Sequence, residues 1–90
     1  MSKIIITIVG KDRVGIVAKT CTYLAENNIN ILDITQTILQ SYFNMMMIVD
    51  ISKSAKSFDD IAKELKAAGL ELGVDILCQR EEIFTSMHRI

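Results

Sequence analysis

Two stretches of this chain are apolar at nearly every position, which is typical of strands buried on both faces of a sheet. The first is Lys3–Val9, which is β-branched almost throughout and stops at Gly10. The second runs from Phe43 to Ile51, where Met46 and Ile48 make the second face apolar as well. A fold that contains both stretches must place them at the centre of a sheet that has further strands on either side.

Two other stretches alternate apolar and polar residues, which predicts half-buried strands at the sheet edges. From Asn30 to Gln40, one face carries Leu32, Ile34 and Ile38, and the other carries Asp33, Thr35 and Thr37. From Leu70 to Cys78, apolar residues alternate with Glu71, Gly73 and Asp75.

A helix near residues 13–27 is predicted by apolar residues at helical spacing on one side, namely Val14, Val17, Cys21, Leu24 and Ala25. Asp12 is the expected N-cap, and Asn27 and Asn28 are the expected stop. A second helix near 58–68 carries the stripe Phe58, Ile61, Leu65 and Ala68. Ser57 is its expected N-cap, with Asp60 in a capping box, and Gly69 is expected to end it.

The order of elements is strand, helix, strand, strand, helix, strand, which is the split βαβ arrangement. The sequence therefore predicts one α+β domain over residues 1–90, a ferredoxin-like βαββαβ sandwich. Its antiparallel sheet has the order 4-1-3-2, with both helices on one face. Residues 81–90 are expected to form a short C-terminal helix or tail.

The helix-free face of this sheet is expected to be apolar at Ile5, Met46 and Ile48, whereas such a face is normally polar and wet. Something must cover it: a second copy of the chain, the terminal segment, or both. Because closed two-fold dimers are the commonest assembly, we expect a homodimer that uses the sheet face, the sheet edges or both.

Composition excludes several classes of function. Ten Lys and Arg against eleven Asp and Glu give no basic surplus for nucleic acid. The two cysteines, Cys21 and Cys78, form no CxxC motif, so no metal site is expected, and both are interpreted as small core residues. The first apolar run is too short for a membrane helix or signal peptide, which favours a cytoplasmic location. No catalytic constellation and no cofactor motif are visible.

The turn Gly10–Gly15 joins a central strand to a helix N-terminus, where free N–H groups attract a carboxylate or a phosphate. The carboxylate of Asp12 offers a partner for an ammonium group. The helix N-terminus and Asp12 together therefore suit a zwitterion such as an amino acid. The simpler interpretation is an ordinary turn with a capping Asp and a glycine.

The segment Gly10–Val17, together with Leu24–Ile31 and its Asn-Ile-Asn-Ile run, resembles the signature of ACT domains. The resemblance covers the whole chain, and residues 83–90 are similar to the ends of small stand-alone bacterial members. It implies a regulatory module that dimerises and, in many members, binds an amino acid at the subunit interface.

The resemblance places ligand contacts in the loop, at Asp12, Arg13, Val14 and Gly15, and across the interface at Asn30. Members often have Pro where this chain has Val14, a departure that leaves the turn less rigid. Arg13 is expected to face solvent or to serve an acidic ligand side chain.

Two alternatives stay open. One is a dimerisation or protein-interaction module with an unidentified protein partner and no small ligand. The other is an acylphosphatase-like enzyme of the same fold, in which Arg13 binds phosphate and Asn30 or Asn44 orients water.

Overall fold

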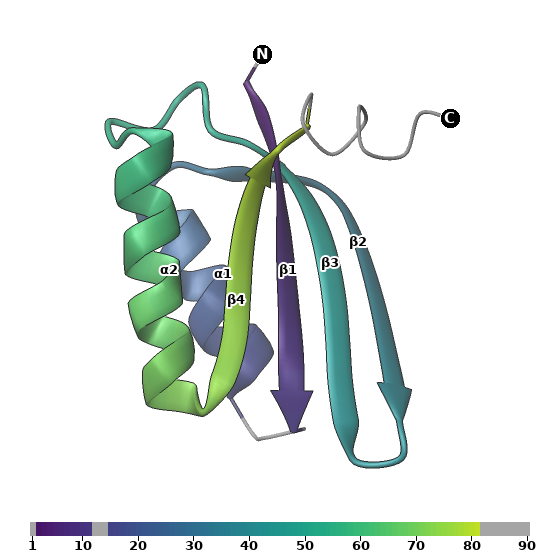
Figure 1. The fold of residues 1–90 in the computed structure, drawn as a ribbon. Helices are drawn as coiled ribbons and strands as arrows, with labels where there is room; N and C mark the ends of the chain where they lie inside the picture. Colours follow the sequence, from purple (N-terminus) through teal and green to yellow (C-terminus); the bar gives the residue numbers. More distant parts are fainter. Residues whose placement is uncertain (1, 12–14, 82–90) are drawn as a thin grey trace.

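The computed structural model describes residues 2–11 and 15–81. In this part of the chain the elements follow the order β1 (Lys3–Lys11), α1 (Ile16–Glu26), β2 (Asn30–Leu39), β3 (Tyr42–Asp50), α2 (Phe58–Leu72) and β4 (Val74–Arg80). The predicted βαββαβ arrangement is confirmed (Figure 1).

The four strands form one sheet with the order β2-β3-β1-β4, and every neighbouring pair is antiparallel. This is the predicted order 4-1-3-2, with β1 and β3 in the centre. The first strand runs two residues further than predicted, because Gly10 and Lys11 still pair with Phe43 and Tyr42.

The core lies between the sheet and the two helices. Ile4, Ile6 and Ile8 of β1 point into it, and so do Met45 and Met47 of β3, which are fully buried. Met46 lies between those two methionines on the opposite face and is 38% exposed. The three consecutive methionines therefore alternate between faces, as expected of a strand, and serve packing.

Helix α1 is shorter than predicted and is rotated about its axis. It begins at Ile16, and its buried residues are Ile16, Thr20 and Leu24, whereas Ala25, placed on the inner side by the sequence, is exposed. The rotation brings a threonine, Thr20, into the core at 3% exposure. Asn27 caps the C-terminus as predicted.

Helix α2 begins as predicted but ends later. The Ser57 hydroxyl accepts a hydrogen bond from the N–H of Asp60 (3.2 Å) and caps the first turn. Gly69 does not end the helix; α2 continues to Leu72 and is closed by Gly73 in the left-handed conformation (φ 77°). A Cβ on Gly69 would lie 2.8 Å from the carbonyl oxygen of Val74, so this glycine is a point where α2 and β4 pack closely.

Strand β2 is less covered than its alternating pattern predicts. In Figure 1 the helices lie toward β4, and β2 is the strand farthest from them. The expected half-burial is wrong, because the apolar side chains Ile31, Leu32, Ile34 and Ile38 are 36–51% exposed. A register shift between Ile31 and Asp33 interrupts the pairing with β3.

The helix-free face is apolar in part, as expected. The register places Ile5, Met46 and Ile48 on it, and Leu77 joins them at 53% exposure. Ile5 is already buried at 3%. Of the predicted terminal segment only Glu81 is described, and residues 82–90 lie outside the described residues. No helix in the described ranges is long and apolar enough to cross a bilayer.

Candidate functional site

The N-terminus of α1 is the best-defined part of the predicted ligand site. Gly15 is the N-cap residue, with φ 94° and no side-chain cap hydrogen bond. Its carbonyl accepts from the N–H of Lys19 (2.9 Å), and the first turn carries no acidic residue. The N–H groups of Ile16, Val17 and Ala18 precede this bond and have no partner within the helix. The described residues of this turn therefore present donors and the positive end of the helix dipole, and none of them carries an acidic side chain.

The left-handed conformation of Gly15 explains why a glycine stands at this position. Residues other than glycine adopt a φ near 94° only with strain, and a Cβ built here meets nothing within 4 Å. Asp12, Arg13 and Val14, the other predicted loop contacts, lie outside the described residues. The predicted capping by Asp12 lies there as well.

Asn30, the remaining predicted contact, lies at the opposite end of the sheet from Gly15 within the same copy of the chain. It opens β2 and pairs with Asp50, whereas Gly15 follows Lys11, which pairs with Tyr42 at the opposite end of β3. Helix α1 spans the distance between these ends, about 16 Å for its 11 residues. One copy of the chain does not bring Gly15 and Asn30 together.

Among the described residues, no strand pairs with the outer edge of β2, which carries apolar side chains. Ile31, Ile34 and Ile38 share a face with buried Val49, Met47 and Phe43 of the neighbouring strand but are themselves 36%, 45% and 51% exposed. Residues 30–39 contain no Lys, Arg or Pro, the residues that commonly protect an edge from pairing. The edge is therefore suited to further pairing.

The sequence analysis missed this edge as a functional surface, since alternation alone predicted that it was half-buried. The absence of lysine, arginine and proline from residues 30–39 was the signal that could have identified it.

The two cysteines are free and partly buried. Cys78 packs against the core, and burial raises the pKa of its thiol to about 11. A thiol with that pKa is almost entirely protonated at neutral pH, which agrees with a packing role. Among the described residues, no group of His, Cys, Asp and Glu side chains is arranged to hold a metal ion.

The two asparagines of the enzyme alternative lie far apart. Asn44 pairs with Val9 on the helix-free face and lines a cavity of about 190 Å³ with Thr35, Thr37 and Met46. Asn30 lies at the far end of the sheet from it. Arg13, which the alternative combines with one or the other asparagine, lies outside the described residues.

Comparison with known proteins identifies relatives along the whole chain. A family model described as an ACT domain matches residues 2–79. A UPF0237 protein of Bifidobacterium longum is 58% identical over 90 residues, and one of Methanocaldococcus jannaschii is 52% identical over 90 residues, each alignment covering 100% of both chains. Among solved structures, an ACT domain protein from Streptococcus pneumoniae matches with a TM-score of 0.81 and 44% identity, covering 92% of this chain and 93% of that one.

Proposed function

The chain belongs to the ACT domain family, and on this premise we propose that it is a non-catalytic regulatory module that binds an amino acid at the interface of a homodimer. The observation that carries the proposal is the open edge of β2. Its apolar side chains, Ile31, Ile34 and Ile38, lie on the helix side of the sheet beyond the cover of the helices.

A second copy supplies the backbone hydrogen-bond partners and the apolar contacts that this edge lacks. Antiparallel pairing of β2 with its two-fold mate satisfies the free backbone groups, and the apolar side chains of both strands then pack together. Burying an Ile side chain stabilises by about 1.5–3 kcal/mol when the burial is complete. The register shift near Ile31 favours pairing over the part of β2 from Ile34 onward.

The same pairing explains how residues that lie at opposite ends of the sheet in one copy form one site between two copies. When two β2 strands run antiparallel, the start of one lies beside the end of the other. The end of β2 is the end of the sheet where Lys11 pairs with Tyr42 and where Gly15 follows. Asn30 of one copy and Gly15 of its mate therefore lie at the same end of the assembly.

The chemistry at that end suits an amino acid. The unpaired N–H groups at the start of α1 hold the α-carboxylate, as helix N-termini hold anions. The side chain of Asp12 or Asn30 holds the α-ammonium group, and Val14 and Gly15 complete the contacts from the loop. Arg13 serves an acidic side chain of the ligand or faces solvent.

The test has two parts, the first of which is sedimentation velocity at about 20 μM. We expect a dimer for the wild type and a monomer for Ile34→Lys, because a charge on this edge opposes pairing. Leu70→Lys is the matched control, since Leu70 is 76% exposed on α2, away from the edge. A wild type that is monomeric, or an Ile34→Lys variant that stays dimeric, contradicts the β2 interface.

The second part is a thermal-shift screen of the dimer against the twenty amino acids. A ligand at 100 times its Kd stabilises the folded state by about 2.7 kcal/mol, a rise in Tm of roughly 10 °C or more for a chain of this size. Asp12→Ala should weaken the binding about tenfold, whereas Lys53→Ala, in the loop after β3, should leave it unchanged. If no amino acid raises Tm, the dimer is an interaction module without this ligand.

A further inference from the structure

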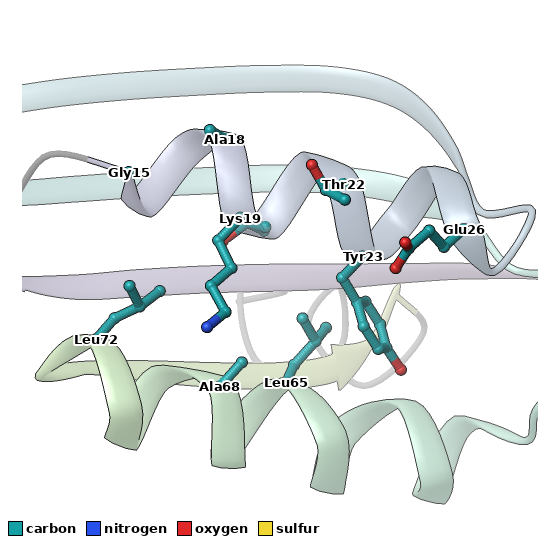
Figure 2. A pocket seen from close by; sticks show the side chains of 10 residues that line it. Gly15, Ala18, Lys19, Thr22, Tyr23, Glu26, Leu65, Ala68 and Leu72 are labelled. Atoms are coloured by element: carbon teal, nitrogen blue, oxygen red, sulfur yellow. The ribbon is translucent and has the colours of Figure 1, made fainter.

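A second cavity lies in the helix layer, away from the edge of β2, and Gly15 at the start of α1 is one of its lining residues. It occupies about 570 Å³ between α1 and α2 (Figure 2). Lys19 and Tyr23 of α1 point toward α2, which contributes Leu65, Ala68 and Leu72 to the lining. Its volume falls within the range of small-molecule sites in proteins.

Polar side chains bridge the two helices at this cavity. Lys19 and Glu71 form an ion pair (3.2 Å), and the Tyr23 hydroxyl donates to a Glu64 carboxylate oxygen (2.7 Å). The α2 wall is apolar and consists of Leu65, Ala68 and Leu72. An apolar wall without packing partners loses dispersion contacts that a bound apolar group restores.

The charges around the cavity leave one group unpaired. Lys19 is held by Glu71, and Lys56 is held by Glu64 and also lies 5.6 Å from the centre of the Tyr23 ring. Glu26 lines the cavity and has no hydrogen-bond or ion-pair partner in the described part of the chain. Figure 2 shows its carboxylate beside the Tyr23 ring. The cavity therefore offers a ligand an apolar surface and a net negative charge.

We propose that this cavity binds an organic ammonium ion with an apolar body. The ammonium group pairs with Glu26 and lies near the Tyr23 ring, whose face attracts cations. The apolar body packs against Leu65, Ala68 and Leu72. A neutral molecule of the same shape gains the packing without the ion pair, and a carboxylate meets Glu26 as a like charge.

Calorimetry on the wild-type chain tests this order with three probes of similar shape: phenethylammonium, phenethyl alcohol and hydrocinnamate. We expect phenethylammonium to bind with a Kd at least threefold lower than that of the alcohol, with hydrocinnamate weakest. Glu26→Gln should abolish the preference for the ammonium over the alcohol. Added salt should reduce that preference in the wild type, since the pair is exposed.

The position of the site is tested by filling it. Ala68→Phe places a ring in the cavity and should abolish binding of all three probes, whereas Ala67→Phe, on the neighbouring exposed residue, should leave binding unchanged. Ala68→Leu, which adds a smaller side chain, and Ala67→Leu repeat the comparison, so that the test survives if Ala68→Phe does not fold. Circular dichroism establishes that each variant keeps its fold.

Three results would overturn the proposal. They are no binding of phenethylammonium to the wild type at millimolar concentration, hydrocinnamate binding more tightly than phenethylammonium, and unchanged binding in folded Ala68→Phe and Ala68→Leu variants. Gly15 lines this cavity as well, but the results are distinguishable from a failure of the amino-acid site because Glu26 and Ala68 are not residues of that site.

Discussion

Replacing Gly69 with alanine sets two physical effects against each other in the middle of α2. A glycine inside a helix costs about 1 kcal/mol relative to alanine, so helix propensity alone predicts that Gly69→Ala stabilises the protein. The tertiary structure predicts the opposite. A Cβ at this position would lie 2.8 Å from the carbonyl oxygen of Val74 and 2.9 Å from Cγ1 of Ile76.

The magnitude follows from which of these neighbours can move. The Ile76 side chain has other rotamers, but the Val74 carbonyl belongs to the backbone of β4. This backbone is held by pairing with β1, in which Val74 lies opposite Gly10. Relief therefore requires that α2 move away from the sheet, and overpacking of this kind costs about 1–3 kcal/mol. After the gain in propensity is subtracted, we expect a net loss of about 0–2 kcal/mol in the free energy of unfolding.

Urea denaturation followed by circular dichroism, at one fixed protein concentration, measures this loss. In thermal melts, each 1 kcal/mol corresponds to a fall in Tm of about 4–8 °C for a chain of this size. Ala67→Gly, at an exposed position of the same helix, calibrates the propensity effect and should cost about 1 kcal/mol. A Gly69→Ala variant that is more stable than the wild type by the roughly 1 kcal/mol that propensity alone predicts would refute the argument that close packing on β4 selects this glycine.

Thr20→Val should stabilise the protein by about 1–2 kcal/mol in the same urea assay, because the buried Thr20 hydroxyl has no hydrogen-bond partner among the described residues; a loss of stability would contradict this. In a Cys21→Ser background, iodoacetamide should modify Cys78 roughly a hundredfold more slowly in the folded chain than in urea at pH 8, since burial raises the thiol pKa from 9.0 to about 11; equal rates would refute it. The hydrogen bond from the Ser52 N–H lowers the pKa of Asp50 below 3.8, so its contribution to stability is present above that pH and is lost as the pH falls. Asp50→Ala should therefore flatten the pH dependence of unfolding in acid, and an unchanged slope would contradict this.

The sequence alone determined the order of elements and the order of strands. Apolar residues on both faces of Lys3–Val9 and of Phe43–Ile51 require neighbours on both sides, which fixes these strands at the centre. The Ser57 cap was equally readable, because a cap depends on residues within one turn of the chain. Such features follow from side-chain periodicity and from contacts between near neighbours.

The end of α2 was decided by tertiary packing. Gly69 and Gly73 are both acceptable helix terminators by local criteria, and only the approach of β4 explains why the first stands inside the helix and the second closes it. The exposure of β2 is a similar case. Alternation shows which face of a strand is apolar, but whether a helix covers that face depends on where the helix lies over the sheet.

The sequence and the tertiary structure each determined part of the candidate site. The glycine before α1 and the absence of acidic residues from its first turn were visible in the sequence, and the structure adds the positive φ of Gly15. Only the structure shows that Gly15 and Asn30 lie at opposite ends of the sheet within one copy, and that a cavity lies between α1 and α2. These arrangements depend on the relative placement of elements distant in sequence, and the periodicity within any one element carries no information about that placement.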